Sequence, residues 1–430
     1  MKAEERADNN DTVTPGHGPS FELFGVEVQL PRTFTALRHR NYRLFWSGQL
    51  ISLIGTWMQT VGQRWLVLMI TNSAFALGLV STVTMLPVLL LSLVGGVVAD
   101  RVDKRRLILV TQACSMALAF TLAILATTKV VQYWHILMLA AMLGTVNAFD
   151  TPTRQSFVVE MTGKEDLANA IGLNSAMFNT ARMLGPAVAG LLIAAVGVAG
   201  CFWLNGVSYL AVIGGLALMR GLRVPERQVE GSPLKNLAEG IRYLWSHRPV
   251  MMLILNIAVS SIFGFPYLVL MPVFAKQVLG GGPATYGTLL SAVGVGALAG
   301  ALTTATLGKQ ARRGSRILMG SAAFAAFLFA FSFSRSYWLS MGLLVATGFA
   351  MVTQNITTNS LIQTVVPDFL RGRIMSVYVL MFLGMVPIGD LQAGSVAQVL
   401  GAPWAVRIGA VVCGLFALFL WRIPEVRKLN

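Results

Sequence analysis

The stretch GGVVADRVDKRR, from Gly95 to Arg106, places two acidic and four basic side chains between two apolar segments, residues 76–98 and 107–128. Neither of those segments contains a charged residue. Each is long enough to cross the hydrocarbon core of a bilayer, which takes about 20 residues in a helix. A short charged turn between two such segments predicts a helical hairpin that crosses a membrane twice.

The composition extends this prediction to the whole chain. Of the 430 residues, 55% are hydrophobic and only 12% are charged, whereas an ordinary soluble domain has about 25% charged residues. We therefore expect an all-α membrane protein. The net charge of +15 would suggest nucleic-acid binding on a soluble domain. Here the basic residues lie in short gaps between apolar segments, so we expect no nucleic-acid partner.

Apolar segments long enough to span a bilayer recur about twelve times. The Tyr-Trp pair at Tyr133 recurs 204 residues later, at Tyr337, and glycines at 144, 185 and 190 recur at the same offset. This periodicity favours two six-helix halves that are related as parallel repeats. The expected spans are 44–70, 76–98, 107–128, 134–156, 167–195, 200–219, 250–274, 284–307, 316–333, 337–364, 374–399 and 403–421.

The distribution of Lys and Arg predicts the orientation. If the amino terminus is cytoplasmic, the inner loops and termini hold 27 of the 33 basic residues, and the outer loops hold only Lys129, Lys276 and Arg335. Cytoplasmic loops of membrane proteins carry such an excess of basic residues. We expect a multi-pass protein of the cell inner membrane with both termini cytoplasmic.

The same pattern divides the chain into domains. The polar residues 1–30 are expected to form a disordered cytoplasmic tail, and residues 425–430 a short cytoplasmic one. Residues 31–219 and 250–424 form the two bundles. Between them, the linker 220–249 contains SPLKNLAEGIRYLW, whose leucines recur at helical spacing. This spacing predicts a short amphipathic helix on the inner membrane face.

No pattern indicates an enzyme or a metal site. Cys114, Cys201 and Cys413 lie in three different apolar segments, and the four histidines are scattered, so we expect no metal and no cofactor. The sequence has no P-loop and no Gly-x-Ser-x-Gly turn. If the protein moves a solute, the lack of an ATP site means that it would draw on an ion gradient.

Three motifs resemble those of the major facilitator superfamily. GGVVADRVDKRR resembles the signature loop after that family's second helix, although Asp103 stands where the pattern has Gly. A degenerate copy, GKQARRGSR, follows at 308–316, and RMLGPAVAGLL at 182–192 resembles the Gly-Pro antiporter motif. PLKNLAEGIRYL and RGRIMSVY are similar to the enterobactin-exporter and macrolide-efflux branch, the transmembrane secretion effectors. The resemblance implies export driven by a proton gradient, through alternating access.

Two carboxylates are candidates for proton coupling. An ionisable side chain in the hydrocarbon costs at least about 2.5–3.5 kcal/mol on insertion scales, so each one needs a reason. Asp390 is the only acid well inside the spans of the second half. It either titrates during transport or forms a fixed ion pair, for which Arg407 in the next span is a candidate. The second carboxylate is Asp150, four residues before Arg154 on one helix face.

Polar and basic residues within the spans are candidates for a substrate cavity. Arg182 precedes Gly185 and Pro186, and either binds an anionic or catecholate-like substrate or bonds to backbone carbonyls that Pro186 releases. Gly190 completes this helix-kink motif. Trp65, Phe263 and Phe265 either stack on a ring-bearing substrate or pack in the core. The cavity candidates are Arg182, Arg64, Gln59, Gln63, Asn147, Asn179, Asn256, Gln354, Asn355 and Asn359.

A third group is expected to act as a conformational gate at the inner face. In the family that the chain resembles, the aspartate of the signature loop acts where the two halves meet. Here Asp100 could bond to the helix that begins near Arg371 and Arg373 when the inner side is closed. The gate candidates are Gly96, Asp100, Arg101, Lys104, Arg105, Arg154, Glu160, Arg371 and Arg373.

The function that these expectations describe is proton-driven export of a siderophore or drug-like small molecule by a monomer. The partners are that anionic or aromatic substrate, protons and the lipid bilayer. Two alternatives stay open: a lipid or lysolipid flippase of the same fold, and a non-transporting membrane sensor or scaffold. A flippase would need a laterally open cavity, and a sensor would tolerate neutralisation of Asp390.

Overall fold

The structure, a computed structural model, describes residues 20–23, 26–29, 32–163, 165–221, 242–307 and 312–429. Strands β1 (Ser20–Leu23) and β2 (Val26–Gln29) pair antiparallel. The expectation of a disordered tail over 1–30 is therefore wrong for these eight residues, whose alternating Phe, Leu and Val favour extended pairing. Most of the predicted amphipathic linker helix and the start of GKQARRGSR lie outside the described residues.

The rest of the described chain is helical. The first half contains η1 (Arg32–Arg38), α1 (Arg40–Thr71), α2 (Ala74–Arg101), α3 (Lys104–Thr127), α4 (Tyr133–Thr162) and α5 (Leu167–Ala217). The second half contains α7 (Arg248–Val259), η2 (Ser260–Gly264), α8 (Tyr267–Val273), η3 (Phe274–Val278), α9 (Pro283–Leu307), α10 (Arg313–Phe331), α11 (Tyr337–Val365), α12 (Asp368–Leu383), α13 (Val386–Leu400), α14 (Ala402–Trp421) and α15 (Pro424–Arg427).

Nine helical segments within the described residues are long and apolar enough to cross a membrane. Large apolar side chains are exposed along them, among them Leu90 (65%), Leu191 (63%) and Val399 (82%). A soluble monomer rarely exposes contiguous apolar surface on this scale. The protein is therefore a multi-pass membrane protein whose outward-facing side chains contact lipid.

Several of the long helices are interrupted. α5 runs for 51 residues, but Gly197 has φ 75° and ψ 173°, so the chain turns sharply there. Glycine is suited to this site because residues with a Cβ rarely adopt such dihedral angles. Residues 248–278 pass from α7 through the π-turn η2 into α8 and η3. The segment 368–400 is divided between α12 and α13 at Gly384 and Met385.

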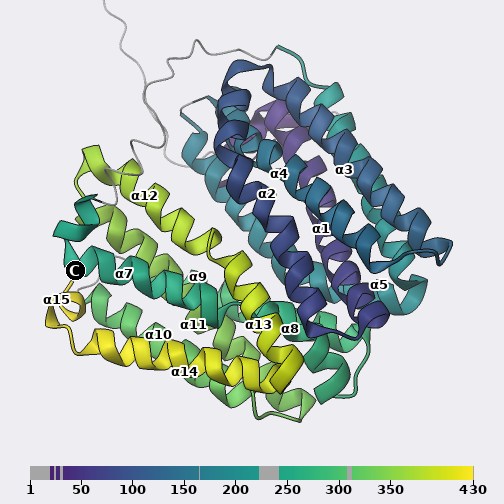
Figure 1. Cartoon of the computed structure of the whole chain (residues 1–430). Helices are drawn as coiled ribbons and strands as arrows, with labels where there is room; N and C mark the ends of the chain where they lie inside the picture. Colours follow the sequence, from purple (N-terminus) through teal and green to yellow (C-terminus); the bar gives the residue numbers. More distant parts are fainter. Residues whose placement is uncertain are drawn as a thin grey trace, which may run out of the picture.

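The helices before residue 221 gather on one side of the molecule and those after residue 242 on the other (Figure 1). We call the end of the molecule where α1 ends and α2 begins the outer end, following the topology expected from the basic residues. The opposite end is the inner end. The lower part of α2 and all of α13 lie together at the outer end in Figure 1, in keeping with their direct contact.

Glycines allow the two halves to approach closely at this outer end. A Cβ built on Gly78 of α2 would lie 2.3 Å from the carbonyl oxygen of Asp390 in α13. A Cβ built on Gly287 of α9 would lie 2.3 Å from the carbonyl oxygen of Pro186 in α5. Since any side chain would collide with backbone at both places, glycine permits these helix crossings.

The inner ends of the two halves show a different arrangement. The ribbon of α12 diverges from that of α2 towards the inner end (Figure 1). Arg371, at the start of α12, forms an ion pair with Asp368 and donates to the Gln363 carbonyl oxygen, 2.9 Å away. The expected contact between Asp100 and the start of α12 stays a prediction.

Candidate functional site

A cavity of about 140 Å³ lies between the two halves. Its walls come from α1 and α5 on one side and from α8, α9 and α11 on the other. Of the ten residues expected to line a substrate cavity, Arg64 and Arg182 are in its wall. The full lining is Trp57, Thr60, Val61, Arg64, Arg182, Pro186, Leu268, Leu290, Val293, Gly294 and Met351.

Arg182 reaches the cavity from α5 and is half-buried. Its guanidinium donates to Oδ1 of Asn179, 3.2 Å away and one helical turn towards the inner end. No bond to a carbonyl released by Pro186 is present in the described part of the chain, so that alternative is wrong for this conformation. The dihedral angles of α5 depart from helical values at Gly197 but not at Pro186. Arg182 keeps donors available for a ligand.

Arg64 reaches the same cavity from α1. Its guanidinium donates to the backbone oxygen of Leu268, at the long distance of 3.5 Å. Neither Arg64 nor Arg182 forms an ion pair with a carboxylate among the described residues. Two buried hydroxyls lie close to these arginines, that of Tyr286 near Arg64 and that of Tyr267 near Arg182. The cavity wall thus presents two cations with no carboxylate partner among the described residues.

Asp390 lies beside this site, at the contact between the halves. The side chain is 5% exposed and accepts a hydrogen bond of 2.5 Å from the Ser81 hydroxyl of α2. One residue along α2, Thr82 donates to the backbone oxygen of Pro387, 2.8 Å away. The charge of Arg64 also acts on the Asp390 carboxyl. Asp390 of α13 is therefore linked to α2 by a hydrogen bond and to the cavity wall through the charge of Arg64.

The alternative of a fixed pair between Asp390 and Arg407 is wrong. Arg407 donates instead to the side chain and the backbone oxygen of Ser332, at 3.3 and 3.4 Å. Its guanidinium also lies over the rings of Phe333 and Trp404. The sequence could not show that Arg407 binds Ser332 rather than Asp390. Ser332 lies in the turn after α10, far from α13 and α14 in sequence, so residue spacing along those two helices carries no signal for it.

Asp150 has a different environment, inside the first half. It is 1% exposed, forms an ion pair with Arg154, and accepts hydrogen bonds from Thr111 (2.6 Å) and Gln112 (3.0 Å) of α3. At the start of α3, Lys104 pairs with Glu160 at the end of α4. These contacts tie the charged turn after α2 to α4.

The remaining gate candidates lie at the inner end of the first half. Their neighbour Asp103, which is not a gate candidate, caps α3 by accepting from the backbone N–H of Arg106 at 3.0 Å. Arg105 donates to the backbone oxygen of Ala217, 3.0 Å away. Gly96 has open space where a Cβ would stand. Arg101 is exposed in the last turn of α2, next to Asp100.

None of the eight predicted amides lines this cavity. Gln59 accepts a 2.6 Å hydrogen bond from Asn205 within the first half, and Asn256 donates to Ser321, 2.9 Å away, within the second. Gln354 is fully buried. Asn359 accepts from Gln363 at 2.6 Å. Gln63, Asn147 and Asn355 are half-buried. Gln63 lies three residues after Thr60 and Asn355 lies four residues after Met351, so each is one turn from a lining residue.

The aromatic residue in the cavity wall is Trp57, which the sequence analysis did not single out. Trp57 also makes an edge contact with Phe178, with ring centroids 6.5 Å apart. Trp65 instead stacks on Tyr286, and Phe265 packs edge-on against Phe324 and Phe382. Helical spacing could have identified Trp57 from the sequence, because Trp57, Thr60, Val61 and Arg64 recur on one face of α1.

The profile of the family described as transmembrane secretion effectors matches residues 32–430. The chain belongs to this family. The resemblance to the major facilitator superfamily is therefore confirmed, and the protein is a transporter rather than an enzyme.

Curated relatives match nearly the whole chain. The staphyloferrin A transporter of Staphylococcus aureus is 26% identical over 363 residues, covering 84% of this chain and 90% of that protein. The multidrug efflux pump Tap of Mycobacterium tuberculosis is 28% identical over 395 residues, covering 89% and 93%. The enterobactin exporter EntS of Shigella flexneri is 24% identical over 396 residues, covering 91% and 94%.

Solved structures show the same fold. A bacterial homologue of the human lysosomal transporter Spinster, in an inward-facing and unoccupied conformation, matches with a TM-score of 0.72 at 14% identity, covering 91% of this chain and 98% of that one. The nucleoside transporter NupG matches with a TM-score of 0.69 at 13% identity, covering 89% and 98%. At such identities the likeness concerns the fold alone.

Proposed function

We propose that this transporter is a proton-driven exporter of an anionic, ring-bearing small molecule of the siderophore or drug-like class. The observation that carries the proposal is the pair Arg64 and Arg182, which share one cavity wall without a carboxylate partner among the described residues. Burying a cation without a counter-ion is costly. An anionic cargo would supply the missing charge.

The membrane arrangement in this proposal has twelve spans in two six-helix bundles. The nine apolar spans of the described chain become ten when α5 is divided at Gly197. α1 and α4 complete the set, since each is at least 30 residues long. Their mean hydropathy is lowered by polar residues such as Gln63 and Asp150. We place both termini on the cytoplasmic side of the inner membrane, because 27 of the 33 basic residues then face inward.

The recognition of cargo follows from the chemistry of the cavity wall. A guanidinium offers a planar fork of donors that matches a carboxylate or a catecholate. Trp57 supplies a ring face next to both arginines. Asn179 and Asn355 extend the site one turn towards the inner end, on the faces of Arg182 and Met351. The names of relatives that carry staphyloferrin A and enterobactin support this cargo class.

Proton coupling is assigned to Asp390. Its carboxyl lies where the outer ends of α2 and α13 meet, and its bond to Ser81 crosses between the halves. Opening of the outer end would break that bond and admit water, so the two conformations would bind a proton differently. Arg64 acts electrostatically on Asp390. An anionic cargo at Arg64 would therefore compete with Asp390, which links cargo binding to protonation.

The inner gate completes the cycle. In the present conformation the halves meet at the outer end, and α12 diverges from α2 (Figure 1). We assign the closing of the inner end to a contact between Asp100 and the start of α12, near Arg371 and Arg373. The buried pair of Lys104 and Glu160 would hold the charged turn in position for this contact.

The test is transport in liposomes with an imposed pH gradient. An iron-free catecholate siderophore and a cationic drug serve as probes for wild type, Arg182→Gln and Arg182→Lys. Loss of a charge-assisted hydrogen bond of about 1.5–3 kcal/mol should weaken siderophore transport by Arg182→Gln roughly tenfold to a hundredfold. Arg182→Lys should keep part of the activity, and the cationic drug should be unaffected by either change.

Asp390→Asn separates cargo binding from coupling. This variant should exchange labelled for unlabelled siderophore but should not respond to the pH gradient. Lys129→Gln, which removes an exposed cation far from the cavity, is the matched control. Equal losses in Arg182→Gln and Lys129→Gln would refute the anionic cargo site, and gradient-driven export by Asp390→Asn would refute the coupling role.

A further inference from the structure

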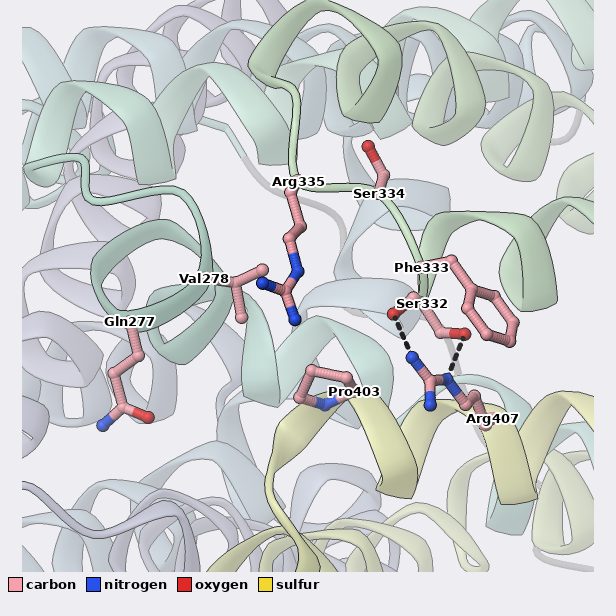
Figure 2. Close-up of a pocket in the computed structure, with 8 residues that line it drawn as sticks. All are labelled: Gln277, Val278, Ser332, Phe333, Ser334, Arg335, Pro403 and Arg407. Carbon is pink, nitrogen blue, oxygen red and sulfur yellow. Dashed lines mark hydrogen bonds between the residues drawn. The ribbon is translucent and has the colours of Figure 1, made fainter.

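A second cavity, of about 210 Å³, lies at the outer end of the second half. It is formed where η3, the turn between α10 and α11, and the start of α14 meet (Figure 2). Its lining contains no acidic side chain and two arginines. The lining residues are Gln277, Val278, Ser332, Phe333, Ser334, Arg335, Pro403 and Arg407.

The two arginines differ in how the protein holds them. Arg407 is fixed, because it donates twice to Ser332 and its guanidinium lies 3.9 Å from the Phe333 ring centroid and 4.7 Å from that of Trp404. Arg335 extends from the turn towards Pro403 (Figure 2). Its side chain has no hydrogen-bond or ion-pair partner among the described residues. The cavity therefore presents one anchored and one available guanidinium.

The sequence offers no carboxylate in the expected outer loops. None of the 18 acidic residues lies in an expected outer loop. Asp390 is the one acid in the outer half of a described span, and it is bonded to Ser81. A counter-anion for Arg335 and Arg407 must therefore come from outside the polypeptide.

Exposed tryptophans identify the level of the cavity in the membrane. Trp134 begins α4, Trp338 begins α11 and Trp404 begins α14, all at the outer end, with exposures of 54%, 79% and 53%. Tryptophan gathers at the boundary between hydrocarbon and headgroups. Trp404 also touches Arg407, so the cavity lies in the headgroup layer. Phe333, 54% exposed, provides an apolar edge beside it.

We propose that this cavity binds the phosphate of an anionic phospholipid of the outer leaflet. Arg335 and Arg407 would bind the phosphate oxygens, Ser334 and Gln277 would contact the polar headgroup, and the acyl chains would run along Phe333. An arginine fork matches the geometry of a phosphate. The exposed aromatic edge favours a lipid over a free anion, because it provides apolar surface next to the charged site.

The proposal can be tested by native mass spectrometry of the purified transporter. Wild type, Arg335→Gln, Arg335→Lys and Lys129→Gln are each titrated with phosphatidylglycerol and with phosphatidylcholine. One cation near a membrane surface contributes about a fivefold change in lipid affinity. We expect Arg335→Gln to bind phosphatidylglycerol about fivefold more weakly, while Arg335→Lys and Lys129→Gln bind it like wild type. Arg335 forms no side-chain hydrogen bond or ion pair among the described residues, so its replacement should leave folding intact.

Competition with inorganic phosphate distinguishes a phospholipid headgroup from a free phosphate ion as the occupant of the cavity. Millimolar phosphate should not displace bound phosphatidylglycerol from wild type. Displacement would mean that the cavity takes a free anion, which would overturn the lipid assignment. Equal affinities of Arg335→Gln and Lys129→Gln, or no preference of wild type for phosphatidylglycerol over phosphatidylcholine, would also overturn it.

Discussion

Gly78→Ala should open the outer end of the transporter. In the present conformation the added methyl group would lie 2.3 Å from the backbone oxygen of Asp390, whereas ordinary contacts begin at 3.4 Å. The Gly394 backbone in α13 is 3.4 Å away on the same side. Because the colliding atoms are backbone rather than a flexible side chain, α2 and α13 must separate by about 1 Å to accept the methyl group.

The size of the effect follows from the cost of overpacking. A methyl group forced into a close-packed contact costs about 1–3 kcal/mol. The cost applies only while the outer ends are in contact, so it shifts the equilibrium towards the outward-open conformation by about fivefold to 150-fold. The gain in helix propensity from Gly to Ala is the same in both conformations and cancels.

Accessibility of a cysteine in the central cavity measures this shift. Leu290→Cys in the cavity wall is introduced into a background in which Cys114, Cys201 and Cys413 are replaced by serine. A membrane-impermeant maleimide is applied from the outer side. Gly78→Ala should raise the labelling rate in proportion to the outward-open population, by about fivefold or more.

The matched control is Gly342→Ala, because Gly342 of α11 has open space where a Cβ would stand. Size-exclusion profiles of both variants report on folding. If Gly78→Ala is monodisperse and its cysteine is labelled no faster than in Gly342→Ala, the close approach of α2 and α13 does not hold the outer end closed. That result would refute the reasoning.

Two further predictions concern the inner end. Lys104→Met removes the buried cation opposite Glu160 and should lower the free energy of unfolding by about 3–5 kcal/mol, measured as a lower Tm in detergent. The double variant Lys104→Met with Glu160→Leu should recover most of this loss. If it recovers none, the stabilisation does not come from the pair. Outside the spans, hydrogen bonding from His39 and the charge of Arg38 lower the pKa of Asp166 below its ordinary value of 3.8. Its carboxylate thus stabilises the fold above pH 3.8, and this contribution is lost as the pH falls through the lowered pKa. Asp166→Asn should flatten that acid part of the Tm profile, and an unchanged profile would contradict the assignment.

The class of protein and the family were accessible from the sequence. Composition alone predicted a polytopic helical protein, because a bilayer demands long apolar spans. The motifs at Gly95–Arg106 and Arg182–Leu192 identified the superfamily, which the profile match over residues 32–430 confirms. The pairing of strands 20–23 and 26–29 was missed, because four residues of alternating apolar and polar side chains are a weak signal within a polar segment.

The cavity was predicted only in part, for a geometrical reason. Gln63 and Arg64 are adjacent in sequence, but successive residues of a helix point about 100° apart, so only Arg64 faces the cavity between the halves. Gln59, four residues before Gln63, bonds to Asn205 instead. Listing polar residues within a span therefore mixes side chains from different faces. Counting from Arg64 by helical spacing selects Trp57, Thr60 and Val61, which do line the cavity.

By itself, the sequence determined that the chain crosses a membrane several times and which ionisable groups lie within its apolar segments, and it predicted the side that carries the basic residues. Those properties depend on local composition and on the energetics of transfer into a bilayer. Only the tertiary structure decided which groups meet: Asp390 with Ser81, 309 residues apart in sequence, Arg407 with Ser332, and Arg64 with Arg182 in one cavity. Helical periodicity defines the residues that share a face, but the packing of the two halves decides what that face contacts.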